Sequence, residues 1–134
     1  YRHGTGHGVG FALNVHEGPQ VLSYYAPVTE HTRLREGMIL SNEPGLYHAG
    51  QYGIRIENLV VNQLKPLAEH DYGEFLEFET LTLCPIHLDP IDLSLLDDSE
   101  KKWLNQYHQM VFEKLSPSLK GDVLDWLTHH TRAI

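Results

Sequence analysis

Apolar and polar positions in the first part of the chain follow the spacing of short strands. Residues 37–43 (GMILSNE) and 75–84 (FLEFETLTLC) have strand length, and residues 53–61 (GIRIENLVV) begin with a period of two. Pro44-Gly45 ends the first stretch and Pro85 ends the last. The pattern predicts three strands, separated by loops over 20–36, 44–52 and 62–73.

Near Pro90 the strand spacing gives way to helical spacing. Apolar residues recur every three to four positions from 99 to 115, namely Trp103, Leu104, Tyr107, Val111 and Leu115. Asp98 or Ser99 suits the N-cap, and Ser116-Pro117 ends the helix. A second helix is expected from residue 121 to 131. We therefore expect an α+β protein, with a β-rich part over residues 1–90 and a helical extension over 91–134.

Glycine is concentrated at the start of the chain, where residues 1–20 hold five of the eleven glycines. Four of them alternate with larger residues from Gly4 to Gly10. In a strand this spacing clears one face for the close approach of a backbone or a ligand. His3 and His7 would then share the opposite face.

Composition and charge exclude several classes of protein. The 134 residues are 41% hydrophobic and carry a net charge of −8, so neither disorder nor binding to a nucleic-acid backbone is expected. No apolar run approaches the roughly 20 residues of a membrane-spanning helix, so no membrane partner is expected. The single cysteine, Cys84, excludes an internal disulfide and fits a reducing, cytoplasmic compartment.

Three side chains have the chemistry of a divalent-metal site. Glu43 ends one predicted strand and Glu57 lies inside the next, so a hairpin would bring the two carboxylates together. His7, on the glycine-rich segment, can join them. One imidazole and two carboxylates suit a divalent ion. The spacing matches no local metal motif, so solvated carboxylates, ordinary surface or core histidines and a simple salt bridge to Arg55 remain open.

Three motifs in fixed order resemble those of the pita-bread metallopeptidases. They are HGTGHGVG followed by VHEGP, then GMILSNEPGLY, then YGIRIENLV, and their wording is most similar to the aminopeptidase P group. The resemblance extends over essentially the whole chain. It implies the C-terminal half of a pita-bread fold, with a curved antiparallel sheet, followed by a helical C-terminal tail.

The same resemblance implies metal ligands. His7 matches a histidine ligand, Glu43 a glutamate ligand that also serves as a general base, and Glu57 a glutamate that bridges two metals. The family adds two aspartates from an upstream strand, and no acid in this chain stands in that order. We therefore expect three of five ligands here, for two divalent ions, manganese by preference. The 134-residue chain alone should be inactive.

The resemblance also implies catalytic roles for three other side chains. His3 and His16 match histidines that bind substrate and move protons, with His16 as donor to the oxyanion. Arg55 matches an arginine in the hydrogen-bond network behind the metals. A longer parent protein would then release the N-terminal residue from peptides with proline in second position. A dipeptide-restricted prolidase and a non-catalytic pita-bread binding module are the alternatives. The C-terminal region is expected to form a homodimer contact.

Overall fold

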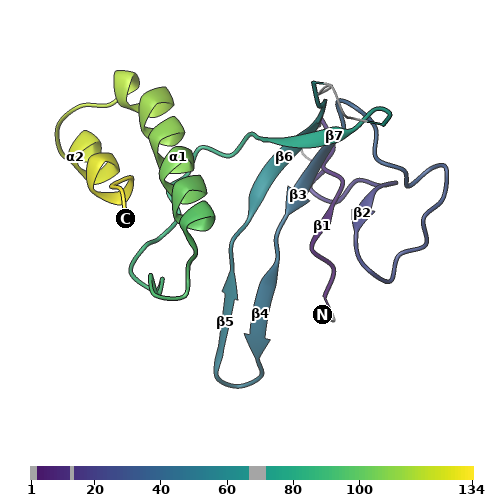
Figure 1. The fold of residues 1–134 in the computed structure, drawn as a ribbon, viewed down its shortest axis with the longest axis horizontal. Coiled ribbons are helices and arrows are strands. Elements are labelled where there is room, and N and C mark those ends of the chain that lie inside the picture. The colour runs from purple at the N-terminus through teal and green to yellow at the C-terminus, as the bar shows by residue number, and fades with distance from the viewer. Residues whose placement is uncertain (1–2, 13, 67–71) are drawn as a thin grey trace. The chain divides into compact units, whose positions relative to one another are not determined.

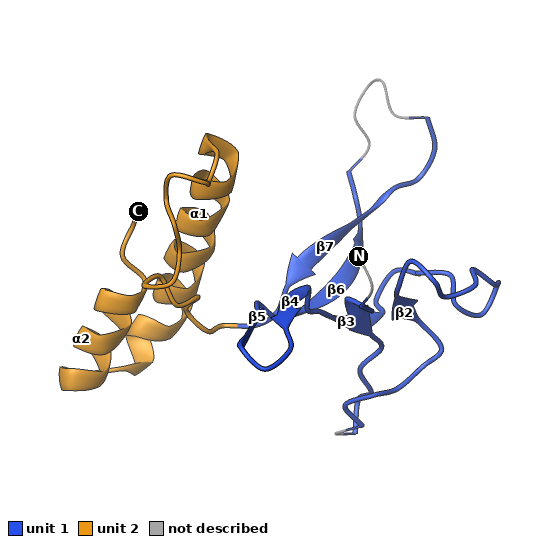
Figure 2. Ribbon diagram, turned by 90° about the horizontal axis from the view of Figure 1, so that it is seen from below, with its two compact units in different colours: residues 1–82 blue, residues 83–134 orange. Residues whose placement is uncertain are grey.

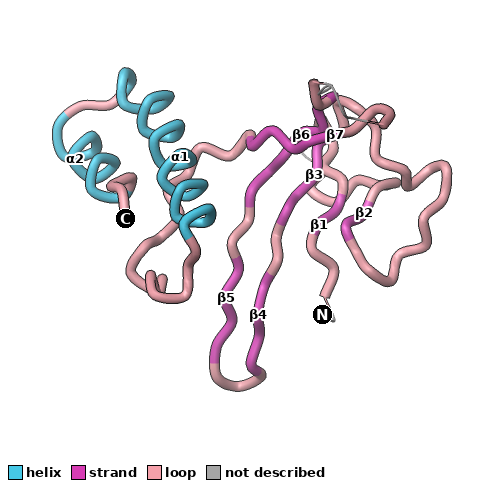
Figure 3. Tube along the Cα trace, viewed as in Figure 1, coloured by secondary structure: helices cyan, strands magenta, loops and turns pink. Residues whose placement is uncertain are grey.

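The computed structural model describes residues 3–12, 14–66 and 72–134. The chain divides into two compact units, residues 1–82 and 83–134, which are coloured separately in Figure 2. Within the described residues, the strands lie in the first unit and the helices in the second (Figure 3). The predicted α+β class is confirmed. The units divide earlier in the chain than the domain boundary predicted at residue 90.

The described chain forms the following elements, labelled in Figure 1. The strands are β1 (Gly6–His7), β2 (Val21–Leu22), β3 (Ile39–Asn42), β4 (Gly45–His48), β5 (Tyr52–Arg55), β6 (Asn58–Leu64) and β7 (Leu76–Thr80). They are followed by helix α1 (Asp98–Leu115), a 3-10 helix (Ser116–Ser118) and helix α2 (Gly121–His130). No helix in these described ranges is long and apolar enough to cross a membrane.

One long antiparallel hairpin runs through the first unit. Strand β3 pairs with β6, placing Asn42 opposite Asn58, and β4 pairs with β5, placing Gly45 opposite Arg55. Each strand advances by three residues between these pairs, so the register is continuous. The ribbon in Figure 1 accordingly runs from β3 into β4 and returns through β5 into β6. Strand β7 pairs with the other edge of β6.

The glycine-rich segment lies along the free edge of β3. Strand β1 pairs with the short β2, and an isolated bridge joins Gly8 to Leu40. The Val9 N–H donates to the Ile39 carbonyl oxygen at 3.1 Å. Residues 8 and 9 are thereby fixed against the beginning of β3.

Several sequence-based element boundaries are wrong. The strand predicted over 53–61 is two strands, β5 and β6, in different ladders. The loops predicted over 20–36, 44–52 and 62–73 contain β2, β4 and the end of β6. The split follows from Pro44 on the facing strand, because proline has no backbone N–H to donate. The ladder is therefore interrupted between β3 and β4 and, opposite them, between β5 and β6. Turn residues at 44–45 therefore interrupt a hairpin that they do not terminate.

The second unit is built on helix α1. Its N-cap is Asp97, one residue before the position expected, and Asp97 forms a capping box with Glu100. The buried core consists of Tyr107, Val111 and Leu127. The preceding segment is fixed to this core, since the Tyr107 hydroxyl donates to the Cys84 carbonyl oxygen at 2.8 Å.

A buried histidine is part of this helical core. His108 has no exposed surface, and its Nε2 accepts a hydrogen bond from the Ile86 N–H at 3.1 Å. A nitrogen that accepts cannot carry a proton, so His108 is neutral in the folded unit. Burial lowers the pKa of His108, and the nearby charge of Arg132 adds to this, against backbone hydrogen bonds that raise it.

We expect the second unit to lose stability in mild acid. The pKa of His108 lies below its ordinary value of 6.5, so the unfolded chain binds the proton first as the pH falls. The stabilisation is complete above about pH 6.5 and declines below it. Urea unfolding followed by tryptophan fluorescence measures this directly, because both tryptophans, Trp103 and Trp126, lie in this unit.

His108→Gln is the matched variant, because the amide oxygen of glutamine can accept from Ile86 and does not titrate. It should flatten the pH dependence between pH 5 and 7 while costing about 1 kcal/mol at neutral pH. An unchanged acid slope in this variant would show that another group is responsible.

Candidate metal centre

Strand β1 brings His7 to the end of β3. The His7 N–H donates to the Ser41 hydroxyl oxygen at 3.0 Å, and the Glu43 N–H donates to the Thr5 carbonyl oxygen at 2.6 Å. This approach requires glycine at position 6, because a Cβ there would collide with the Ser41 carbonyl oxygen. The alternating glycines predicted this close approach from the sequence. The strand they form is only two residues long.

The His7 and Glu43 side chains meet, and both are mostly buried. The Nε2 atom of His7 lies 3.1 Å from Oε1 of Glu43, with 21% and 16% of the side chains exposed. His7 Nδ1 lies 2.9 Å from the Gly8 carbonyl oxygen, which can only accept, so Nδ1 carries a hydrogen. In the neutral ring, Nε2 then presents its lone pair to a carboxylate. A lone pair and a carboxylate repel each other, so this contact is favourable only when a cation, either a proton or a metal ion, lies between them.

Glu57 stands opposite Glu43 in the hairpin. Continuing the register from the Asn42–Asn58 and Gly45–Arg55 pairs places residue 43 opposite residue 57. Directly opposed residues point to the same face of a sheet, and like charges in that position repel. A cation between the two carboxylates relieves this repulsion. Glu57 is exposed, whereas Glu43 is mostly buried.

Tyr47 and Arg55 extend the same face of the hairpin. Arg55 Nε donates to the Tyr47 hydroxyl at 2.9 Å and lies 3.7 Å from Oε2 of Glu43. The hydrogen bond to Tyr47 holds the pKa of Arg55 above its ordinary value, and the charges of Glu43 and Glu57 act in the same direction. Arg55 therefore remains a cation next to the two carboxylates, as a counter-charge and an orienting group.

The two remaining candidate histidines lie beside this group. The ring centroid of His16 is 4.2 Å from that of His7, and His3 packs edge-on against Tyr47 at 4.9 Å. Both histidines are exposed, as side chains that meet a substrate must be. Their roles in binding and proton transfer stay predictions.

Sequence reasoning missed two side chains that hold the candidate residues. Ser41 contacts both His7 and Glu43, and Tyr47 holds Arg55. A signal for Tyr47 was present in the sequence, since glycines stand at 45 and 53. A Cβ at either position would strike the Tyr47 ring, so the two glycines make room for it.

The donor set fits a divalent ion but is incomplete among the residues that the structure describes. Imidazole and carboxylate ligands suit manganese and related ions better than they suit soft, thiolate-bound metals. Within residues 3–12, 14–66 and 72–134, no three histidine, cysteine, aspartate or glutamate side chains are placed to hold a metal ion. The described chain supplies a close pair, His7 and Glu43, with Glu57 opposite by register.

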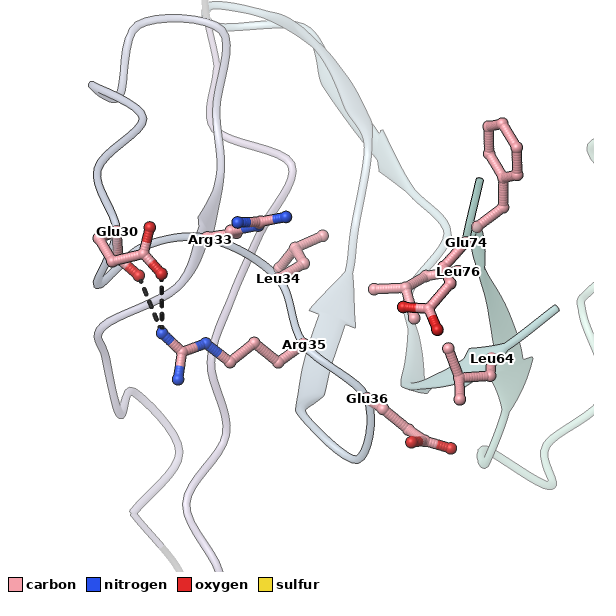
Figure 4. A pocket seen from close by; sticks show the side chains of 9 residues that line it. Glu30, Arg33, Leu34, Arg35, Glu36, Leu64, Glu74 and Leu76 are labelled. Carbon is pink, nitrogen blue, oxygen red and sulfur yellow. Dashed lines mark hydrogen bonds and ion pairs between the residues drawn. The ribbon is translucent and has the colours of Figure 1, made fainter. Parts of the chain in front are cut away.

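A separate cavity in the first unit contains none of these residues. It has a volume of about 580 Å³ and lies between the loop of residues 30–36 and the paired ends of β6 and β7 (Figure 4). In that view Arg35 reaches Glu30, an ion pair of 3.3 Å. The pair is exposed, and the lining mixes charges of both signs with leucines, so it indicates no particular ligand.

Two family models match the chain and together span most of it. The model of metallopeptidase family M24 matches residues 1–63, and the model of the C-terminal region of peptidase M24 matches residues 74–134. The first match contains all six candidate site residues. The second contains β7 and both helices.

Individual relatives match the whole chain at high identity. A probable Xaa-Pro aminopeptidase P of Coprinopsis cinerea is 51% identical over 100% of this chain and 22% of its own length. Aminopeptidase P2 of Arabidopsis thaliana is 50% identical over 100% of this chain and 19% of its own length. The chain therefore spans about one fifth of the length of these relatives.

A solved structure has the same fold. The crystal structure of the X-prolyl aminopeptidase from Caenorhabditis elegans, described as a cytosolic enzyme with a di-nuclear active site, superposes with a TM-score of 0.83. The two sequences are 39% identical over 98% of this chain and 21% of that one. The likeness supports the predicted C-terminal part of a peptidase fold, an antiparallel sheet followed by a helical tail.

We predict that Gly45→Ala disrupts the Tyr47–Arg55 contact. The new Cβ collides with the Tyr47 hydroxyl, so the ring must swing away and its hydrogen bond to Arg55 is lost, which lowers the free energy of unfolding. In a Tyr47→Ala background the same change should cost little or nothing, so the effects of the two substitutions should not add. Denaturant unfolding followed by circular dichroism measures all four members of this cycle.

Gly4→Ala is the control, because a Cβ there meets only the Leu22 carbonyl oxygen at 3.9 Å. Equal costs for Gly45→Ala with and without the tyrosine ring would show that Tyr47 is not what Gly45 accommodates.

Proposed function

The chain belongs to metallopeptidase family M24, and we propose that the protein carrying it is a metal-dependent aminopeptidase that releases the N-terminal residue from peptides with proline in second position. The observation that carries this proposal is the 3.1 Å contact between His7 Nε2 and Glu43 Oε1, in the tautomer that leaves Nε2 free for a cation. The names and high identity of the relatives support the choice of substrate. The protein acts in the cytoplasm, and the description of the nematode relative as a cytosolic enzyme supports this location.

Two divalent ions, manganese by preference, occupy the complete site. His7, Glu43 and Glu57 hold them, and two aspartates from a part of the protein outside this chain complete the ligand set. When bound, two such ions supply a nucleophile at neutral pH and polarise the scissile carbonyl. The di-nuclear site named for the nematode enzyme supports the metal count.

The side chains of this chain perform the proton and charge steps. A bond before proline is a tertiary amide without an N–H, so recognition cannot depend on that hydrogen. His16, exposed beside His7, donates to the developing oxyanion and passes a proton toward the proline nitrogen, with His3 assisting. Arg55 orients Glu43 through its charge. Glu43 also serves as the general base.

The enzyme is a homodimer formed through the second unit. Trp103, Val123 and Trp126 lie on helices α1 and α2 with 50%, 56% and 52% of their surface exposed. Large apolar side chains left exposed on helices are available to bury against a second copy of the chain. Sedimentation velocity of the full-length protein should give the mass of two chains, and Trp126→Glu should shift it toward one.

Tyr24→Glu is the control for this shift, because Tyr24 is 90% exposed and lies in the first unit. A single-chain mass for the unmodified protein at every concentration would end the dimer proposal.

The activity is tested by product release from defined peptides. Full-length protein, stripped by a chelator and then reloaded with manganese, should free the first residue of an X-Pro-Y tripeptide and leave X-Ala-Y intact. His7→Ala and Glu57→Ala should each lower kcat/KM by at least 100-fold, because each removes a ligand.

The 134-residue chain by itself is the natural negative control, and it should release nothing. Cleavage of X-Pro dipeptides alone would assign the protein as a prolidase. If a folded full-length protein releases no product with any divalent ion, the protein would be assigned as the non-catalytic binding module.

A further inference from the structure

One buried hydroxyl connects the two paired candidate ligands. Ser41 lies in strand β3 and has no exposed surface. Its Oγ accepts from the His7 N–H at 3.0 Å and donates to Oε1 of Glu43 at 2.8 Å. Because a backbone N–H can only donate, the Ser41 hydroxyl hydrogen is available for the carboxylate. The direction of both hydrogen bonds is thus fixed.

The buried Ser41 hydroxyl has its hydrogen bonds to water replaced by bonds to the candidate ligands. A hydroxyl removed from water is unfavourable unless its hydrogen bonds are replaced, and here both are. Its neighbour Leu40 is also fully buried, so this part of β3 is covered on both faces. An apolar side chain at position 41 would leave the His7 N–H without this acceptor and Glu43 without this donor.

Glu43 depends on a side-chain hydrogen bond for its position, because it lies just outside the paired part of β3. It follows the last residue of β3, and Pro44 interrupts the ladder immediately after it. Its remaining ionic contact, with Arg55, is longer at 3.7 Å and involves a side chain that is 50% exposed. Ser41 is therefore its buried and short-range anchor, and the same hydroxyl anchors the strand that carries His7.

We propose that Ser41 is a positioning residue that fixes the Glu43 carboxylate relative to His7, so that the pair is arranged for a divalent ion before the ion arrives. The inference rests on the proposed function in one respect, namely that the ion bound at this site is a metal ion. Hydrogen bonds that orient metal ligands typically account for 10- to 100-fold in metal affinity. The role of Ser41 is measured as affinity for the ion, independently of peptide cleavage.

The experiment titrates Mn²⁺ into chelator-stripped full-length protein, with a fluorescent indicator competing for the ion. Ser41→Ala should weaken binding by at least 10-fold. Ser41→Thr, which keeps the hydroxyl, should remain within about threefold of the unmodified protein. Ser41→Val has the same shape as Ser41→Thr but no hydroxyl, and it should bind as weakly as Ser41→Ala.

The threonine and valine variants decide the question even where Ser41→Ala fails to fold, because they differ only in the hydroxyl. Equal Mn²⁺ affinity for these two variants would overturn the proposal. So would a Ser41→Ala protein that is folded and binds Mn²⁺ like the unmodified one.

Thr82→Val is the control for loss of a hydroxyl that accepts a hydrogen bond from the same sheet. The Thr82 hydroxyl accepts from the Leu59 N–H at 2.7 Å, and Leu59 is the residue opposite Ser41 in β6. This variant removes a comparable hydrogen bond without touching Glu43, so its Mn²⁺ affinity should be unchanged. A loss equal to that of Ser41→Ala would attribute the effect to the sheet and overturn the proposal.

Failure of the proposed function gives a different result. A protein that cleaves no X-Pro peptide but still loses Mn²⁺ affinity in Ser41→Ala and Ser41→Val would retain the positioning role and lose the activity. A protein that cleaves X-Pro peptides with unchanged Mn²⁺ affinity in those variants would retain the activity and lose the positioning role.

Discussion

The candidate site depends on the unbroken register of a single hairpin. Because the β3–β6 and β4–β5 pairings follow one continuous register, Glu43 and Glu57 lie opposite each other at the interruption next to Pro44. A change of register by one residue would turn one carboxylate to the opposite face. The interruption also frees the backbone at this point from the ladder. The side chains there are instead fixed by hydrogen bonds from Ser41 and by the charge of Arg55.

The hairpin has two chemically different faces. Tyr47 and Arg55 share one face with the glycines opposite them, and the two carboxylates extend it by register. The other face carries Leu46, Ile54 and Ile56, which line an apolar groove of about 330 Å³ and are each about half exposed. This alternation puts polar chemistry on one side and a surface suited to burial on the other. The incomplete ligand set and the open apolar face fit a chain that spans about one fifth of its relatives.

The helical unit is organised by its own contacts. Its core forms around Tyr107, Val111 and Leu127. The backbone carbonyl of Cys84 accepts a hydrogen bond from Tyr107, and the backbone N–H of Ile86 donates one to His108. The neutral state of His108 makes the stability of this unit sensitive to pH, and the tryptophan fluorescence of the unit follows that stability directly.

The sequence by itself determined the α+β class, the helical tail and the identity of the six candidate residues, whereas it assigned the segments of β2 and β4 to loops. Helix α1 was predictable because its apolar spacing is strictly local, and the close approach of β1 was predictable because only glycine permits it. The tertiary structure decided that residues 53–61 serve two ladders, that Glu43 is anchored by Ser41, and that Tyr47 holds Arg55. These contacts join residues distant along the chain or across a hairpin, and only the register and burial of the folded sheet determine which of them meet.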